Sequence, residues 1–217
     1  MTFKQTAIQK ARRYLRAADP VMRTVIDAVG PFTLRLERDR FGMLVRSIIS
    51  QQISTSAARS IRRRLQELAG TDGLTPANLA TFTVDQLRSV GLSPQKASYV
   101  VDLASKVNDG MLDLRQIGRL GDERIVEQLI QVKGIGRWTA QMFLIFSLGR
   151  LDVFPHDDLG VRTAIRNRYG LADLPDKQTA HAIAAPWRPY ATVASWYCWR
   201  TLDLARKTDT VAKGYPT

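Results

Sequence analysis

The chain has 217 residues, 45% of them hydrophobic, so it can bury a sizeable core and is not a disordered polypeptide. Its longest uninterrupted apolar run, Met142 to Phe146, is far shorter than the roughly 20 residues that a membrane span needs. The single cysteine, Cys198, excludes a disulfide framework, a four-thiolate zinc site and a cysteine-held iron–sulfur cluster. The amphipathic N-terminus lacks a secretion signal, and we expect a soluble, intracellular protein.

The net charge indicates a polyanionic partner. Lys and Arg total 32 against 20 Asp and Glu, which gives +12 at pH 7. A domain this basic usually binds nucleic acid, and arginine, which supplies most of the excess, pairs well with phosphate. The clusters Arg12, Arg13 and Arg16 and Arg62 to Arg64 are interpreted as solvated faces, one of them lying along nucleic acid. Composition alone does not distinguish DNA, RNA and an acidic protein.

Helical periodicity runs through almost the whole chain. Apolar residues recur at helical spacing over residues 41–49, 58–68, 97–107, 125–130, 138–148 and 161–169, and again from residue 190. Ser93 and Pro94 form the N-cap and first turn of the helix that includes residues 97–107. Gly170 ends the helix over residues 161–169. Strand-like alternation is confined to Phe32, Leu34 and Leu36. The predicted fold class is therefore all-α.

No break between these helices is long enough to be a flexible linker. We expect two helical lobes, about 39–150 and 1–38 plus 151–217, packed as one unit. A cleft between the lobes would be the natural site.

The segment from Leu129 to Phe143 predicts a helix, a tight hairpin and a second helix. Gly134 and Gly136 bracket Ile135, which allows a sharp turn and a close approach of the backbone to a ligand. A helix that starts near Arg137 would direct its unpaired amides, and the positive end of its dipole, out of the turn. Such a turn suits a phosphate. The alternative is an ordinary helix–helix connection, because Gly-x-Gly alone is a weak signal.

Two aspartates, Asp157 and Asp158, precede a later helix. An acidic residue at this place is most often an N-cap, and either aspartate could be only that. Two adjacent carboxylates exceed what one cap needs. We therefore expect one of them to cap the helix and the other to face the cleft.

The glycine hairpin with a downstream aspartate resembles the helix-hairpin-helix DNA glycosylase superfamily, and within it the AlkA-type 3-methyladenine DNA glycosylases. The stretches SIISQQIS (Ser47–Ser54), GLSPQKASY (Gly91–Tyr99) and PWRPYATVASWY (Pro186–Tyr197) support the match, which covers about residues 40–205. The chain is most similar to compact members that lack the N-terminal β-rich domain of AlkA.

The resemblance implies a role for particular residues. Asp158 falls on the catalytic aspartate, which leaves Asp157 to capping or hydrogen bonding. Gln52, a leucine in AlkA, falls on the side chain that fills the gap left by a flipped nucleotide. Trp138, Trp196 and Met142 would line the base pocket, with Met142 in place of a tyrosine of AlkA. Trp187 and Trp199 are assigned to the core, as is Cys198.

The hairpin carries two further implied sites. Its DNA phosphate would be held by residues Lys133, Gly134, Ile135, Gly136 and Arg137. A monovalent cation, Na⁺ or K⁺, would be held by the backbone carbonyls of Ile130, Val132 and Gly134. No other cofactor is implied.

The implied activity is that of a monofunctional DNA glycosylase, which flips and hydrolytically excises alkylated purines such as 3-methyladenine and 7-methylguanine from double-stranded DNA in base excision repair. Bifunctional relatives carry a Schiff-base lysine where this chain has Trp138, which cannot form an imine. We expect a monomer without membrane association, in the bacterial cytoplasm at the nucleoid or in a eukaryotic nucleus. The alternatives are a non-catalytic helix-hairpin-helix protein that binds DNA damage, and a glycosylase for another damaged base.

Overall fold

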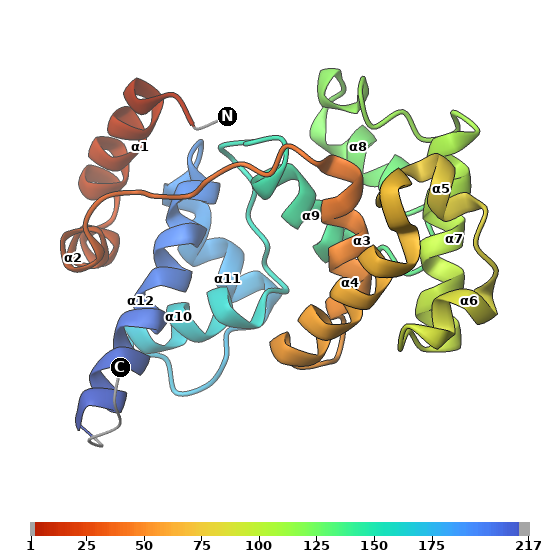
Figure 1. The fold of residues 1–217 in the computed structure, drawn as a ribbon. Helices are drawn as coiled ribbons and strands as arrows, with labels where there is room; N and C mark the ends of the chain where they lie inside the picture. Colours follow the sequence, from red (N-terminus) through yellow and green to blue (C-terminus); the bar gives the residue numbers. More distant parts are fainter. Residues whose placement is uncertain (1–2, 213–217) are drawn as a thin grey trace. The chain divides into compact units, whose positions relative to one another are not determined.

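The computed structural model describes residues 3–212, with side chains described through residue 205, and its regular structure there is entirely helical (Figure 1). The predicted all-α class is confirmed. The α-helices are α1 (Gln5–Ala18), α2 (Pro20–Val29), α3 (Arg40–Ser50), α4 (Thr55–Ala69), α5 (Pro76–Ala80), α6 (Val84–Ser89), α7 (Pro94–Asn108), α8 (Asp122–Leu129), α9 (Arg137–Phe146), α10 (Leu159–Tyr169), α11 (Lys177–Ala184) and α12 (Ala191–Ala212). Short 3-10 turns lie at η1 (Gly70–Asp72), η2 (Ile117–Arg119) and η3 (Ala185–Trp187). In the described part of the chain, no helix is long and apolar enough to cross a membrane.

The chain divides into two compact units. Residues 37–148 form one, here called the inserted unit, and residues 1–36 with 149–217 form the other, here called the terminal unit. In the terminal unit α12 packs against α2 and α10, and α1 packs against α2. The apolar faces of these helices meet in one core that includes Leu15, Ile26, Ile165, Trp187 and Tyr197.

A buried carboxylate connects three parts of the terminal unit. Asp19 caps α2, because its Oδ1 accepts from the amides of Val21 and Met22 at 2.9 and 3.0 Å. Its Oδ2 accepts from the Trp187 indole at 2.8 Å and from the Tyr169 hydroxyl. Burial, together with this hydrogen bond to Asp19, raises the pKa of the Tyr169 hydroxyl. Asp19 therefore stabilises the unit through partners from α2, α10 and η3.

The inserted unit contains α3 to α9. Several of its helices begin at a capping side chain: Asp39 caps α3, Ser54 caps α4 and Ser93 caps α7, whereas α8 and α9 begin after glycines. The α3 helix packs against α4, α7 and α9, so it forms the centre of the unit (Figure 1). The α9 helix is buried from Thr139 to Ile145.

Most predicted helices are confirmed, and the differences are local. Each apolar repeat of the sequence lies on a helix of the structure, and the Ser93 cap and the left-handed Gly170 end are both present. Five helices were not predicted. The short α5, α6 and α11 each contain at most two large apolar side chains, too few to show a period, and α1 and α2 lie in the N-terminal segment, where no helix was predicted. Residues 32–36 belong to the terminal unit and form no strand, although Arg35 takes part in an isolated bridge, and Phe32 and Leu34 pack against the terminal core.

Candidate functional site

The glycine hairpin connects α8 to α9 in the inserted unit. Gly134 has φ +78°, which only glycine adopts readily, and a Cβ atom there would lie 2.0 Å from Cδ2 of Tyr99. Gly136 is the N-cap residue of α9, which begins at Arg137 as predicted. Any side chain at position 134 would therefore displace the Tyr99 ring as well as strain the turn.

Hydrogen bonds within the inserted unit hold some hairpin groups and leave others available. The Lys133 amide donates to Oδ2 of Asp102 at 2.9 Å, and the Ile135 amide donates to the Val132 carbonyl at 3.1 Å. In the part of the chain that the structure describes, the amides of Gly134 and Gly136 have no acceptor. Among the hairpin residues expected to bind phosphate, Gly134 and Gly136 thus offer the amides for it.

Charged side chains brace both ends of the hairpin. Asp102 pairs with Lys106 at 2.6 Å, and its pKa is lowered because the hydrogen bonds from Lys106 and the Lys133 amide outweigh the opposing effect of burial. The Arg137 guanidinium donates to both oxygens of Glu123 at 3.2 and 2.8 Å, which lowers the pKa of that carboxyl. The Arg137 side chain is therefore already engaged with α8.

The α3–α4 loop carries Gln52 in a strained conformation. Gln52 has φ +55°, the one positive value at a non-glycine residue in the described chain, and its side chain is exposed. A left-handed residue of this kind costs about 1–3 kcal/mol and persists only where its surroundings fix it. Here Lys96 donates through Nζ to the carbonyls of Ile49, at 2.8 Å, and Gln51. The Gln51 side chain also donates to the Gly134 carbonyl at 2.8 Å, so the loop and the hairpin are directly connected.

Asp158 lies in the terminal unit, at the start of α10. Its Oδ1 accepts from the Val161 amide at 2.8 Å and from the Trp199 indole, also at 2.8 Å. The side chain is half-buried. These two donors fix the carboxylate at the positive end of the helix dipole.

Of the two roles expected for Asp157, capping or hydrogen bonding, the structure contradicts capping. Asp158 is the residue immediately before α10 and its side chain reaches the third residue of the helix, whereas Asp157 is one residue too far away. The Asp157 side chain is 66% exposed and lies 3.2 Å from Nε2 of His156. Asp158, to which the resemblance assigns the catalytic role, is therefore also the N-cap residue of α10.

Trp199 packs against the terminal core as expected, but its hydrogen bond to Asp158 was not predicted. Gly160 makes the contact possible, because a Cβ atom there would lie 3.0 Å from Cδ1 of Trp199 and 3.1 Å from Oδ1 of Asp158. A glycine in the first turn of a helix is unfavourable without such a reason. In the sequence, this glycine two residues after Asp158 indicates that another side chain packs closely against the start of the helix.

The three residues expected at the base pocket differ in exposure. Trp138 is 44% exposed at the start of α9, whereas Met142, one turn later on the same face, is only 6% exposed. Trp196 is also 6% exposed, and it packs in the terminal core against Phe32, with ring centroids 4.6 Å apart. Trp138 therefore exposes far more of its side chain than Met142 or Trp196 does. Cys198 is buried as expected, and burial raises the pKa of its thiol to about 12.

Two of the three carbonyls expected to bind a cation take part in hydrogen bonds. The Gly134 carbonyl accepts from Gln51 and the Val132 carbonyl from the Ile135 amide. A carbonyl oxygen has two lone pairs, so neither hydrogen bond prevents these oxygens from also binding a cation. No group of three or more His, Cys, Asp or Glu side chains that could hold a metal occurs among the described residues.

The inserted unit supplies a glycine turn with two available amides and a strained loop bonded to it, and the terminal unit supplies a fixed carboxylate at a helix start. These features fit a DNA base-excision protein. Residues 45–189 match the model of the HhH-GPD superfamily of base excision DNA repair proteins, and the chain belongs to that family. It is 32% identical to DNA-3-methyladenine glycosylase 1 of Schizosaccharomyces pombe over 95% of this chain and 92% of that protein. It is 30% identical to DNA-3-methyladenine glycosylase 2 of Escherichia coli, over 73% of this chain and 57% of that one.

Solved structures show the same fold. The S. pombe 3-methyladenine DNA glycosylase in complex with abasic DNA superposes with a TM-score of 0.82 at 31% identity, covering 90% of this chain and 98% of that one. A DNA-3-methyladenine glycosidase from Bacillus halodurans gives a TM-score of 0.80 at 32% identity, covering 94% and 92% of the two chains.

Proposed function

We propose that this protein is a monofunctional DNA glycosylase that removes alkylated purines, of the 3-methyladenine and 7-methylguanine type, from double-stranded DNA in base excision repair. The observation that carries the proposal is Asp158, a carboxylate fixed by the Val161 amide and the Trp199 indole at the position of the family's catalytic aspartate. The names of its relatives, 3-methyladenine glycosylases from yeast and bacteria, support the substrate class.

The chemistry follows from the charge of the substrate. An N-alkylated purine is cationic, so it leaves as a neutral molecule and needs no strong general acid. Positive charge then develops on the sugar, as in glycoside hydrolysis, and the Asp158 carboxylate stabilises it and orients the attacking water. The base must first leave the duplex stack, and Gln52 fills the space that it vacates.

Trp138 accounts for base binding and for the absence of strand cleavage in this proposal. Its exposed indole offers an electron-rich face to the cationic base, worth roughly 0.5–2 kcal/mol. The resemblance also assigns Met142 and Trp196 to base binding, and both side chains are buried, each within its own unit. Trp138 also occupies the position of the Schiff-base lysine of bifunctional relatives, so the product is an intact strand with an abasic site.

In the proposed function the hairpin binds both a DNA phosphate and a cation. The amides of Gly134 and Gly136, assisted by Lys133, Ile135 and Arg137, bind a DNA phosphate. The carbonyls of Ile130, Val132 and Gly134 hold a structural Na⁺ or K⁺. The protein acts as a monomer where the DNA is, at the bacterial nucleoid or in a eukaryotic nucleus.

The experiment is to incubate the protein with DNA methylated by an alkylating agent and to identify free bases by chromatography. Release of 3-methyladenine or 7-methylguanine, with none from unmethylated DNA, is the expected result. Tight binding to methylated or abasic DNA without any released base would instead favour a non-catalytic damage-binding protein. Release of only uracil or oxidised bases would refute the substrate class.

A further inference from the structure

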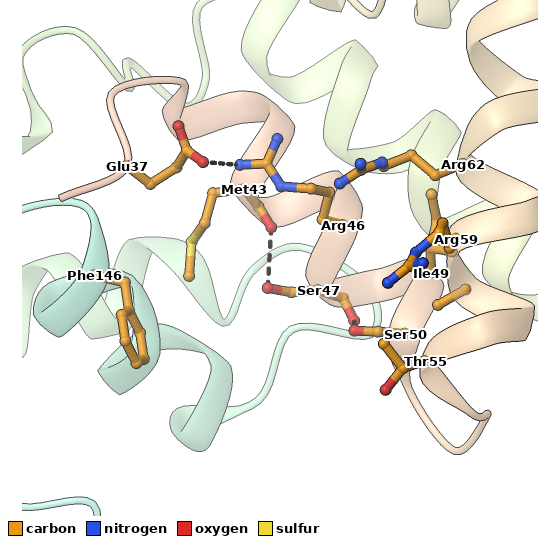
Figure 2. Close-up of a pocket in the computed structure, with 11 residues that line it drawn as sticks. Glu37, Met43, Arg46, Ser47, Ile49, Ser50, Thr55, Arg59, Arg62 and Phe146 are labelled. Atoms are coloured by element: carbon orange, nitrogen blue, oxygen red, sulfur yellow. Dashed lines mark hydrogen bonds and ion pairs between the residues drawn. The ribbon is translucent and has the colours of Figure 1, made fainter. Parts of the chain in front are cut away.

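A cavity of about 490 Å³ lies in the inserted unit, between α3, α4 and the end of α9 (Figure 2). Its wall combines guanidinium groups, hydroxyl groups and a few apolar side chains, and includes Met43, Arg46, Ser47, Thr55, Arg59 and Arg62. None of these residues belongs to the hairpin or to the Asp158 site. The cavity is large enough for a small ligand or for part of a polymer.

The arginines around this cavity differ in their partners. Arg46 pairs with Glu37 at 2.6 Å and lies 3.6 Å from Asp39, so carboxylates of its own unit compensate it (Figure 2). Arg59 and Arg62 are exposed, and among the described residues no carboxylate lies within ion-pair distance of either. The cavity therefore keeps two uncompensated positive charges.

Two other arginines on α4, Arg63 and Arg64, differ from Arg59 and Arg62 because both have partners within the inserted unit. Arg63 pairs with Glu67 at 3.3 Å, and Arg64 donates to the Val90 carbonyl at 2.8 Å. Neither lines the cavity. Of the cluster Arg62 to Arg64 that the sequence offered for nucleic acid, only Arg62 is thus directed to the cavity, and it is joined there by Arg59, one helical turn earlier.

The positive charge of Arg59 and Arg62 favours an anionic ligand. A cationic alkylated purine would be repelled by Arg59 and Arg62, whereas a phosphate would be attracted and could also accept from the Thr55 hydroxyl. We propose that this cavity is a second DNA phosphate site, separate from the hairpin, in which Arg59 and Arg62 bind the backbone of the strand next to the lesion. The inference rests on DNA being the partner in the proposed function.

The position of the cavity supports a strand contact close to the lesion. Thr55 is the first residue of α4 and follows Gln52 by three residues, so the site begins where the wedge loop ends. From Thr55 to Arg62 the helix rises by about 10 Å, and each DNA strand carries one charge per about 3.4 Å of helix axis. Two arginines one turn apart can therefore bind one or two successive phosphates.

The test measures binding to a duplex with an uncleavable abasic analogue at several salt concentrations, for the wild type and for R59Q, R62Q and the double variant. Each phosphate contact contributes about 0.9 to the slope of log affinity against log salt concentration. We expect each single variant to reduce the slope by about one and the double variant by about two. R63Q is the matched control, because Arg63 lies on the same helix outside the cavity, and its slope should equal that of the wild type.

Single-turnover release of methylated base at saturating protein separates the alternatives. With a phosphate contact, the rate at saturation stays near the wild-type value and only the affinity falls. An unchanged slope in the double variant, or an equal loss in R63Q, would overturn the proposal. The proposal would also be wrong if the variants lowered the rate of base release at saturating protein but left the salt slope of binding unchanged. That result would indicate that the cavity binds the base. If the wild type releases no base at all but the slopes change as expected, the phosphate site stands and the proposed glycosylase activity fails.

Discussion

The Trp199 indole donates to Asp158 Oδ1 at 2.8 Å, and Oδ1 is also the atom that caps α10. The two residues are 41 positions apart in the chain; Asp158 immediately precedes α10 and Trp199 lies on α12, both in the terminal unit. Two donors on one oxygen hold the carboxylate group in a single orientation. Trp199 is therefore a positioning residue for the proposed chemistry.

Trp199→Phe should lower the rate of base release about tenfold and leave the affinity for abasic-analogue DNA unchanged. The phenyl ring keeps most of the packing but removes a hydrogen bond to a charged group, worth about 1.5–3 kcal/mol. Single-turnover kinetics and a binding titration on the same preparation separate the two effects. If rate and affinity fell together in proportion to lost folded protein, the residue would be merely structural.

Gly160→Ala is the companion change, since its Cβ would press against both Trp199 and Asp158. It should also reduce the rate, without removing any hydrogen-bonding group. Full activity of this variant would show that the Trp199–Asp158 contact tolerates displacement and does not position the carboxylate.

Gln52→Ala should impair the processing of damaged duplex more than base release from single strands. A duplex contains a gap to be filled after the base has flipped, and a single strand does not. The expectation rests on the exposed side chain of Gln52, which lies on a loop whose backbone is left-handed at this residue. Equal losses on the two substrates would argue against a wedge.

Borohydride added during the reaction should trap no covalent protein–DNA adduct, and the strand should stay intact. The reason is Trp138, whose indole cannot form an imine at the position of the lyase lysine. Denaturing gels of labelled DNA report both properties. A trapped adduct would identify another nucleophilic amine in the site and reverse the monofunctional assignment.

Asp19→Ala should lower the free energy of unfolding by about 2–4 kcal/mol, because it removes the cap of α2 and leaves the buried Trp187 indole without its acceptor. Asp19→Asn is the matched control and should cost less, since its side-chain oxygen can still accept one of these bonds. Denaturant titration measures both. A loss below 1 kcal/mol for the alanine variant would contradict the central place given to this carboxylate.

Much of the fold could be predicted because the helices have clear apolar periods and caps. The α7 helix was predicted from Ser93, Pro94 and its apolar face, and α10 from its end at Gly170. The short α5, α6 and α11 were not, because each contains at most two large apolar side chains and shows no period. The α1 and α2 helices were also missed, although Asp19 and Pro20 mark the start of α2.

The site was less predictable because its contacts join distant residues. The hairpin and the aspartate pair were visible as local motifs. Nothing local indicates that the Lys133 amide binds Asp102, that Gln51 reaches Gly134, or that Arg63 is paired while Arg62 is not. For the same reason the sequence did not show which of the two aspartates caps α10. The capping residue depends on where α10 begins, and the structure places that start at Leu159.

The most direct test of the account is single-turnover release of methylated base by Asp158→Asn. Asparagine can still cap α10 and accept from Trp199, so the fold and DNA binding should persist, as a titration with abasic-analogue DNA would show. Losing the negative charge should lower the rate on the order of 10²-fold or more. Asp157→Asn is the control and should stay near wild type, because that side chain is exposed and does not cap. Full activity in Asp158→Asn, or loss of activity in Asp157→Asn alone, would contradict the assignment of the catalytic carboxylate.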